Sequence, residues 1–281
     1  MHNNKYDQIE NLDGALVQHG SFNNRIYLMD IGNANPEKLM SKLITLAQKR
    51  GYSKIFAKVP SSKSSPFIAM GFQQEARIPF FYRGAEEAQF LGYYLNNSRK
   101  QELHCKELDN ILRIAKLRKK NPRIKPLPSK YLVRRCVPDD VEAMAKIYRT
   151  VFPTYPFPIH DPEYLRNTME THVEYFGIEI FGQLVALSST EMDQKSKSAE
   201  MTDFATLPEW RGRGFACNLL RKMEQTMKSK NFQLTYTIAR AISPGMNITF
   251  AKLGYVFGGR LINNTNISGQ IESMNVWYKK I

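Results

Sequence analysis

The chain has 281 residues, a formal net charge of +14 and 42% hydrophobic residues. This length suits two globular domains, and no apolar run is long enough for a transmembrane helix, so we expect no membrane partner. The N-terminus is polar and lacks the apolar segment of a signal peptide. Three widely spaced cysteines indicate neither a metal site nor a disulfide framework. We therefore expect a cytoplasmic protein without a metal cofactor.

Most of the positive charge lies in one segment, residues 99–130, which holds eleven Lys or Arg residues against three acidic ones. The segment has no aromatic side chain on which nucleic-acid bases could stack. A solvated helix is the better interpretation, and we expect no nucleic-acid partner. Prolines within residues 121–128 end this helix. We predict an N-terminal α/β domain over residues 1–98, a basic linker helix and Pro-rich connection over 99–130, and a second domain over 131–281.

In the N-terminal domain, hydrophobic periodicity predicts a strand at 25–29, a helix at 36–50 and a strand at 54–59. The segment 67–72 (FIAMGF) then echoes the segment 250–255 (FAKLGY) of the second domain. The echo suggests a degenerate half of the same fold, and chance similarity in so short a unit is an equally good explanation.

After residue 131, predicted strands and helices alternate. In chain order we expect a strand at 131–136, helices at 138–151 and from 161, a hairpin of 173–181 with 184–192, a strand at 199–206, a helix at 215–230, a strand at 233–238, a helix at 245–253 and a strand pair from 255. Asp161 followed by Pro162 is a typical helix start. Prolines within residues 153–158 exclude regular structure there.

The most informative motif is residues 211–216, Arg-Gly-Arg-Gly-Phe-Ala, at the turn from the predicted strand 199–206 to the predicted helix 215–230. Glycines leave backbone N–H groups unobstructed, and a helix N-terminus carries partial positive charge, so such a turn can hold a pyrophosphate. The motif lacks the signatures of the Walker and Rossmann loops. An ordinary loop with a helix-capping glycine is the alternative.

This motif closely resembles the Arg/Gln-x-x-Gly-x-Gly/Ala motif of the GNAT acetyltransferases, and the element order over 131–281 looks like a complete GNAT domain. The resemblance implies an α/β fold with a mixed central sheet, flanked by helices and splayed beside the strand before the phosphate loop. It also implies acetyl-CoA as cosubstrate. The cofactor-binding residues that it implies are Phe204, Ala205 and Thr206 for the pantetheine, Arg211, Gly212, Arg213, Gly214, Phe215 and Ala216 for the pyrophosphate, and Ser243 in the place of a family asparagine.

Acetyl transfer to an alkyl amine requires a proton to leave an ammonium with a pKa of about 10.4. Glu200 and Asp203 lie on the strand before the phosphate loop, and the strand's period of two places them on opposite faces. The resemblance places Glu200 at the position of the base in histone-acetylating members, and Asp203 at an acidic position of small-amine members. We expect Glu200 to be the base, with Asp203 as the alternative, and a structural role fits either. Glu191 and Asp193 could instead bind an ammonium or be solvated.

One family residue is missing. Aligned on Lys252, Gly254 and Tyr255, the chain has Phe250 where related enzymes have the tyrosine that is offered to the departing thiolate. Tyr236, Tyr255 or a water could replace it, or the thiolate leaves unprotonated. Phe250 itself is expected to be a packing residue.

The segment 261–279 is rich in amide and hydroxyl side chains, which suits a zwitterionic diamine. Together with 154–158 and 241–247 it resembles the β-lysine N6-acetyltransferase family, whose product is an osmotic solute or a catabolic intermediate. We expect an acetyl-CoA-dependent transferase acting on this small-molecule amine. A polyamine or protein-lysine acetyltransferase and a non-catalytic acyl-CoA sensor are alternatives. The substrate-binding residues expected are Tyr155 and Phe157 along the aliphatic chain, Glu272 at the ammonium that is not acetylated, and Asn247 and Asn275.

Overall fold

The structure is a computed structural model that describes residues 6–118 and 126–281. We call the part up to residue 100 the N-terminal half and residues 131–281 the C-terminal half. The N-terminal half contains the strands β1 (Gln8–Leu12), β2 (Ala15–Gly20), β3 (Arg25–Asp30), β4 (Lys54–Pro60), β5 (Gln73–Tyr82) and β6 (Glu86–Tyr94), and the helices α1 (Pro36–Arg50), α2 (Ser65–Ala69) and α3 (Asn97–Lys100). Helix α4 (Cys105–Leu117) follows, and residues 119–125 of the predicted connection lie outside the described residues.

The strands and helices expected after residue 131 are all present. They are β7 (Tyr131–Arg135), α5 (Val141–Val151), α6 (Pro162–Thr171), β8 (Val173–Ile180), β9 (Gln183–Asp193), β10 (Ser198–Thr206), α7 (Phe215–Ser229), β11 (Leu234–Arg240), α8 (Pro244–Lys252), β12 (Val256–Ile267) and β13 (Gln270–Lys280). Asp161 caps α6 as expected and accepts a hydrogen bond from the N–H of Glu163 at 3.0 Å. Among the described residues, no helix has the length and apolarity that crossing a membrane requires.

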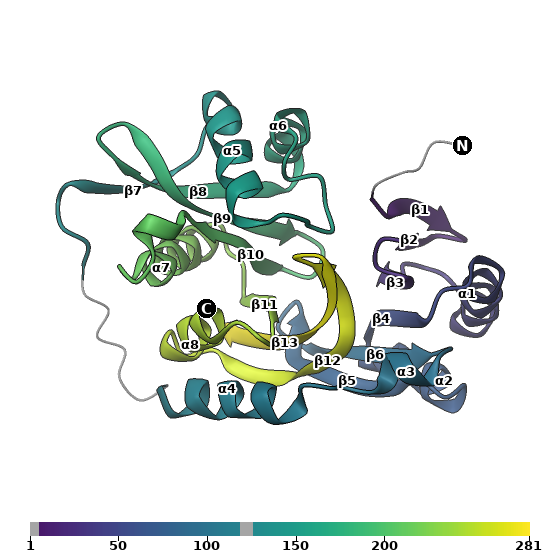
Figure 1. Cartoon of the computed structure of the whole chain (residues 1–281). Coiled ribbons are helices and arrows are strands. Elements are labelled where there is room, and N and C mark those ends of the chain that lie inside the picture. The colour runs from purple at the N-terminus through teal and green to yellow at the C-terminus, as the bar shows by residue number, and fades with distance from the viewer. Residues whose placement is uncertain (1–5, 119–125) are drawn as a thin grey trace.

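Strands of both halves form one sheet, in the order β1-β2-β3-β4-β6-β5-β12-β13-β11-β10-β9-β8-β7. The sheet bends strongly, so the N-terminal strands and β8–β10 rise on either side of the β12–β13 hairpin (Figure 1). Only β3 with β4 and β10 with β11 are parallel neighbours among the strand pairs described. The sheet crosses the predicted boundary between the two domains. The residue bounds of the domains stay predictions.

The two halves repeat one topology. In each, a parallel strand pair is joined by a long helix: β3 and β4 by α1, and β10 and β11 by α7. A shorter helix, α2 or α8, then leads into a hairpin, β5–β6 or β12–β13. The second strand of that hairpin pairs antiparallel with the strand before the short helix. The N-terminal half is therefore GNAT-like in strand order.

The sequence echo has the same geometry in both halves. The N–H of Phe72 donates to the carbonyl of Phe67, and the N–H of Tyr255 donates to that of Phe250, each at 3.1 Å. The rings of each pair meet edge to face, with centroids 5.2 Å apart in the first and 5.0 Å in the second. The matching ends of α2 and α8 favour a repeated unit over chance similarity.

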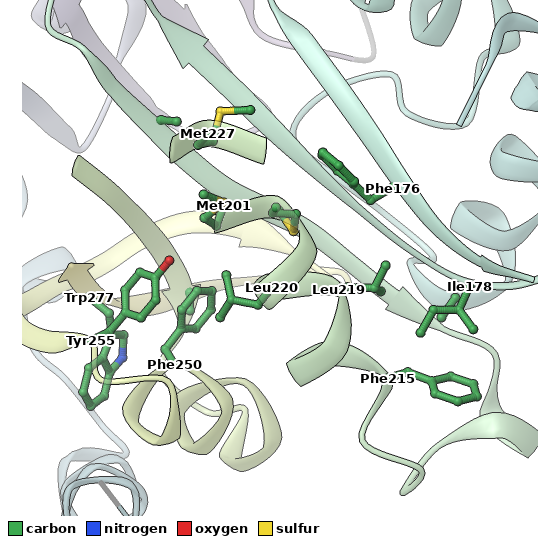
Figure 2. Packing of buried hydrophobic residues seen from close by; sticks show 14 of the residues in the cluster. Phe176, Ile178, Met201, Phe215, Leu219, Leu220, Met227, Phe250, Tyr255 and Trp277 are labelled. Carbon is green, nitrogen blue, oxygen red and sulfur yellow. The ribbon is translucent and has the colours of Figure 1, made fainter. Parts of the chain in front are cut away.

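Helices cover both faces of the C-terminal part of the sheet. Helix α7 packs on one face of β8–β10, and α5 and α6 pack on the other (Figure 1). Leu220 of α7 lies beside Phe250 of α8 and near Tyr255, which follows that helix (Figure 2). Helix α4 lies along α8 through the stripe Leu108, Ile111 and Ala115. These layers fix the turn between β10 and α7 at the edge of the core.

The halves join where β5 meets β12. Gly259 pairs with Ala76, and a Cβ at Gly259 would lie 2.3 Å from the carbonyl oxygen of Glu75, so only glycine allows this approach. Beside it, the fully buried Lys54 ammonium bonds to the Glu75 carboxylate (2.8 Å) and to the Ile262 carbonyl (2.7 Å). The N–H of Ile262 donates to Glu75 at 3.0 Å. One buried ion pair thus binds β4 and β5 to β12.

The amide-rich end of β12 makes further contacts with the N-terminal half. The Arg25 guanidinium donates to the Asn264 carbonyl (2.5 Å) and that of Arg99 donates to the Asn263 carbonyl (2.6 Å). The N–H of Asn266 donates to the Asn23 side chain at 2.8 Å. These backbone contacts of the asparagines hold the two halves together.

Replacing Glu75 with Ala should lower the free energy of unfolding by about 3–5 kcal/mol, because the Lys54 ammonium stays buried without a partner. Burial already lowers the pKa of Lys54 to about 8 against the opposing effect of Glu75. Glu87→Ala on β6 is the control, because Glu87 pairs with the exposed Arg77 at 3.8 Å, a contact worth less than about 1 kcal/mol. Urea unfolding measures both, and equal losses would contradict the importance of the buried pair.

Candidate active site

The turn between β10 and α7 has the geometry of an anion site. Gly212 and Gly214 both have a φ of 77°, a left-handed conformation that favours glycine. Gly214 is the N-cap of α7, and no side chain caps this helix, so its first N–H groups are left for a ligand. The Arg213 guanidinium lies 5.1 Å from the centroid of the Trp210 ring and adds positive charge.

A cavity of about 630 Å³ opens beside this turn, where β10 and β11 part. The two strands pair only through residues 198–200 of β10 and 234–236 of β11, and their remaining residues are not paired with each other. This is the splay that the sequence resemblance implies. The expected cofactor-binding residues that line the cavity are Phe204, Thr206, Arg211, Gly212, Arg213, Gly214, Phe215, Ala216 and Ser243.

A bulge in β10 decides where its carboxylates point. The pairing with β9 shifts between Thr202 and Ala205, and Asp203 has a φ of 55°. The extra residue reverses the alternation, so Met201 packs beneath α7 whereas Ala205 packs beneath α5. Glu200 and Asp203 therefore share one face, in contrast to the opposite faces expected of a regular strand. Ala205 is buried in the core and does not line the cavity, contrary to expectation.

Asp203 is a buried carboxylate in the cavity wall. It accepts hydrogen bonds from the hydroxyls of Tyr155 and Ser189, the latter at 2.5 Å. Burial raises the pKa of Asp203, although these hydrogen bonds oppose the shift. Burial and the negative charge of Asp203 raise the pKa of the Tyr155 phenol well above its usual value. The pair is thus a protonated phenol beside a carboxylate that is more basic than an exposed aspartate.

Glu200 lies at the inner end of the splay but does not line the cavity. It is directly opposite Tyr236 on β11 and Glu191 on β9. Burial raises the pKa of Glu200, although the positive charge of Lys58 and a hydrogen bond from Tyr236 lower it. Burial and the charges of Glu200 and Asp203 raise the pKa of Glu191. Three carboxylates with raised pKa values therefore gather on one face, which favours proton uptake and cation binding.

Asn247 and Asn275, expected to bind substrate, are fully buried with hydrogen-bonded amides and do not line the cavity. The Asn247 amide nitrogen donates to the Arg240 carbonyl at 3.0 Å, and its oxygen accepts from Asn275 (2.8 Å) and Trp277 (2.9 Å). The Asn275 oxygen accepts from Arg260 at 3.1 Å. These amides join α8 to β11, β12 and β13.

Glu272 and Phe157 also lie where they do not fit the substrate-binding roles expected of them. The Glu272 carboxylate forms a bidentate ion pair with Arg240, at 2.6 and 2.7 Å, so its charge is already compensated. Phe157 packs against the core beneath α5 and does not line the cavity. Of the expected substrate residues, Tyr155 does line the cavity. The last strands contribute the apolar side chains of Ile267 and Met274 to the cavity wall.

The missing family tyrosine has a candidate substitute. Phe250 is buried and packs edge to face on Tyr255, as expected of a packing residue. The hydroxyl of Tyr255 is bonded to Thr235 at 2.8 Å, and Tyr236 is bonded to Glu200. Among the described residues, Tyr155 is the only tyrosine that lines the cavity.

Part of the N-terminal half faces this site, which the sequence alone did not predict. The charge of Glu200 acts on Lys58 of β4 and on Tyr27 of β3, so these side chains lie within electrostatic range of it. A signal existed, since two lysines interrupt the buried apolar strand β4. In the part of the chain that the structure describes, no group of three His, Cys, Asp or Glu side chains is arranged to hold a metal ion.

Comparison with known proteins agrees with this geometry. The Acetyltransferase (GNAT) family model matches residues 141–255. The chain is 41% identical to the β-lysine N6-acetyltransferase of Methanococcus maripaludis over 97% of this chain and 98% of that protein. It is 34% identical to that of Methanosarcina mazei, over 87% and 97% respectively. A spermidine N-acetyltransferase of Vibrio cholerae, solved with CoA and spermine, covers 54% of this chain and 96% of its own, with a TM-score of 0.47 and 20% identity. The chain belongs to the GNAT acetyltransferase family and is an N-acetyltransferase.

Proposed function

We propose that this enzyme transfers the acetyl group of acetyl-CoA to the N6 amine of β-lysine (3,6-diaminohexanoate) in the cytoplasm, giving N6-acetyl-β-lysine. One observation carries the proposal: similarity to two β-lysine N6-acetyltransferases extends over 97% and 87% of this chain and so includes the N-terminal half. An enzyme that shared only the GNAT fold with these relatives would match over the C-terminal half alone.

Acetyl-CoA fits the cavity between β10 and β11. The space above the turn is open, since a Cβ at Gly212 or Gly214 would meet no other atom within 4 Å. The uncapped start of α7, with Arg211 and Arg213, would hold the pyrophosphate. The separated edges of β10 and β11 would hold the pantetheine, with the thioester toward Asp203 and Tyr155.

The chain's own residues then handle protons. Asp203 lines the cavity, whereas Glu200 does not. Asp203 takes a proton from the N6 ammonium, and the neutral amine attacks the thioester carbonyl. The C–N bond forms, the C–S bond breaks, and Tyr155 protonates the departing thiolate. Tyr155 recovers a proton through its hydrogen bond to Asp203. Of the two protons that the ammonium loses, one ends on sulfur and one goes to water.

A comparison of kcat/KM for β-lysine, α-lysine, ornithine and spermidine tests the substrate. We expect β-lysine to be preferred, because a site that pairs each polar group of its substrate discriminates against analogues that leave one unpaired. Thiol release from acetyl-CoA measures turnover, and steady turnover excludes a non-catalytic sensor. A clear preference for spermidine or for a peptide lysine would contradict the β-lysine assignment and leave the fold and family unaffected.

Gly214→Val should weaken acetyl-CoA binding at least about tenfold, because a branched side chain covers the N–H groups of α7. Gly182→Val in the β8–β9 turn is the matched control: Gly182 has a φ of 78° and open surroundings, so it bears the same backbone strain without bordering the cavity. Calorimetric titration with acetyl-CoA compares the two. Equal affinities would contradict the phosphate-loop assignment.

Asp203→Asn should lower kcat about 100-fold or more and leave the acetyl-CoA Kd unchanged. Activity should partly recover above pH 9, because more of the substrate amine is then already neutral. Asp161→Asn, which exchanges one good N-cap of α6 for another, is the control and should keep the wild-type pH profile. If the pH–rate profile of the Asp203 variant matched that of the wild type, another group would be the base.

A further inference from the structure

A row of polar side chains crosses three neighbouring strands beside the proposed reaction centre. Glu191 of β9, Glu200 of β10 and Tyr236 of β11 are direct strand neighbours, at the point where the pairing of β10 with β11 ends. The two glutamates are half-buried, so water still reaches them. Glu191 makes no hydrogen bond and no ion pair with the residues that the structure describes. Two adjacent carboxylates repel each other, and within this row only the hydrogen bond from Tyr236 to Glu200 offsets the repulsion.

The N-terminal half lies against this row. Phe81 of β5 packs on Tyr236, with ring centroids 5.1 Å apart. The Lys58 ammonium of β4 lies 5.5 Å from the centroid of the Phe81 ring. A short chain of contacts therefore leads from the carboxylates of one half to a cation of the other.

The half-buried Lys58 differs from the buried cations of its half. Lys54 is paired with Glu75, and Arg25 and Arg99 donate to carbonyls of β12. Lys58 makes no ion pair within 4 Å and no hydrogen bond with the described residues. Burial by itself would lower the pKa of Lys58, but the phenols of Tyr27 and Tyr82 and the Glu200 carboxylate outweigh it and leave the pKa raised. The side chain stays charged.

We propose that Lys58, Glu191 and Glu200 form the subsite that recognises the end of the acceptor substrate that is not acetylated. Lys58 binds the carboxylate at C1, and the two glutamates hold the ammonium at C3, while N6 lies at Asp203. This inference rests on the proposed function and assigns its specificity to the N-terminal half.

The charges match in kind and in order. Three carboxylates and one ammonium in the protein face two ammonium groups and one carboxylate in β-lysine. Asp203 lies in the cavity wall, Glu200 three residues back on the same strand, and Lys58 beyond it on the other half. This is the order N6, N3, C1 along the substrate. A polyamine has no carboxylate for Lys58, and a peptide lysine has no second ammonium for the glutamates.

The test uses β-lysine and 1,4-diaminopentane, which is β-lysine without its carboxylate. Lys58→Met should lower the ratio of kcat/KM for β-lysine to that for 1,4-diaminopentane by about 30-fold, mostly through KM, since a charge-assisted contact is lost for one substrate only. Glu191→Gln should raise KM for both substrates and leave their ratio unchanged, because both carry the second ammonium. Lys195→Met, at the exposed β9–β10 turn, is the control.

Stability separates this role from a structural one. Glu191→Gln removes one of two adjacent, half-buried carboxylates and should raise the Tm, whereas loss of a structural contact would lower it. Acetyl-CoA affinity, measured for each variant, should stay at the wild-type value.

Two results would overturn the inference. One is an unchanged substrate ratio in Lys58→Met, including an equal loss for both substrates, and the other is a wild-type enzyme that turns over the two substrates equally well. The second would remove the carboxylate subsite without affecting acetyl transfer to amines. A wild-type enzyme that acetylates neither substrate would overturn the proposed function itself, and the inference with it.

Discussion

The junction between β5 and β12 determines how the N-terminal half faces the catalytic strand. Its centre is the buried pair of Lys54 and Glu75, and both charged groups also bond to the backbone of Ile262. Burying two charges is costly, and these extra bonds offset much of the cost. Lys58 follows Lys54 by four residues on β4, and successive even positions of a strand share one face. The contact that fixes Lys54 at the junction therefore also aims Lys58 at β10.

Local patterns predicted the elements of the C-terminal half and the phosphate loop well. The turn at Gly212 and Gly214, the N-cap Asp161 and the order of strands depend on residues close together in sequence, which the sequence displays directly. The repeat was also visible, as a six-residue echo. Its significance became clear only from the matching ends of α2 and α8, because so short a similarity has no weight without geometry.

The substrate residues could not be predicted, because their roles depend on long-range pairing. The amides of 261–275 suggested a polar pocket, but the Asn263 and Asn266 side chains donate to carbonyls across the junction, and Asn247 and Asn275 bond to each other. A sequence rich in amides does not say whether those amides face a ligand or a neighbouring strand. Likewise, the bulge at Asp203 reverses the faces of β10, and strand periodicity alone cannot reveal one extra residue.

The repeated fold allows one half to hold the proposed cofactor site while the other has a different role. The side chain of Asn35 caps α1 and accepts a hydrogen bond from the N–H of Lys38 at 3.0 Å, whereas α7 begins at Gly214 without a side-chain cap. A capped helix start has fewer free donors for a pyrophosphate. The N-terminal half therefore has no counterpart of the phosphate site. Its β4 strand does not have to hold a pantetheine, so Lys58 is free to face the carboxylates of the catalytic half.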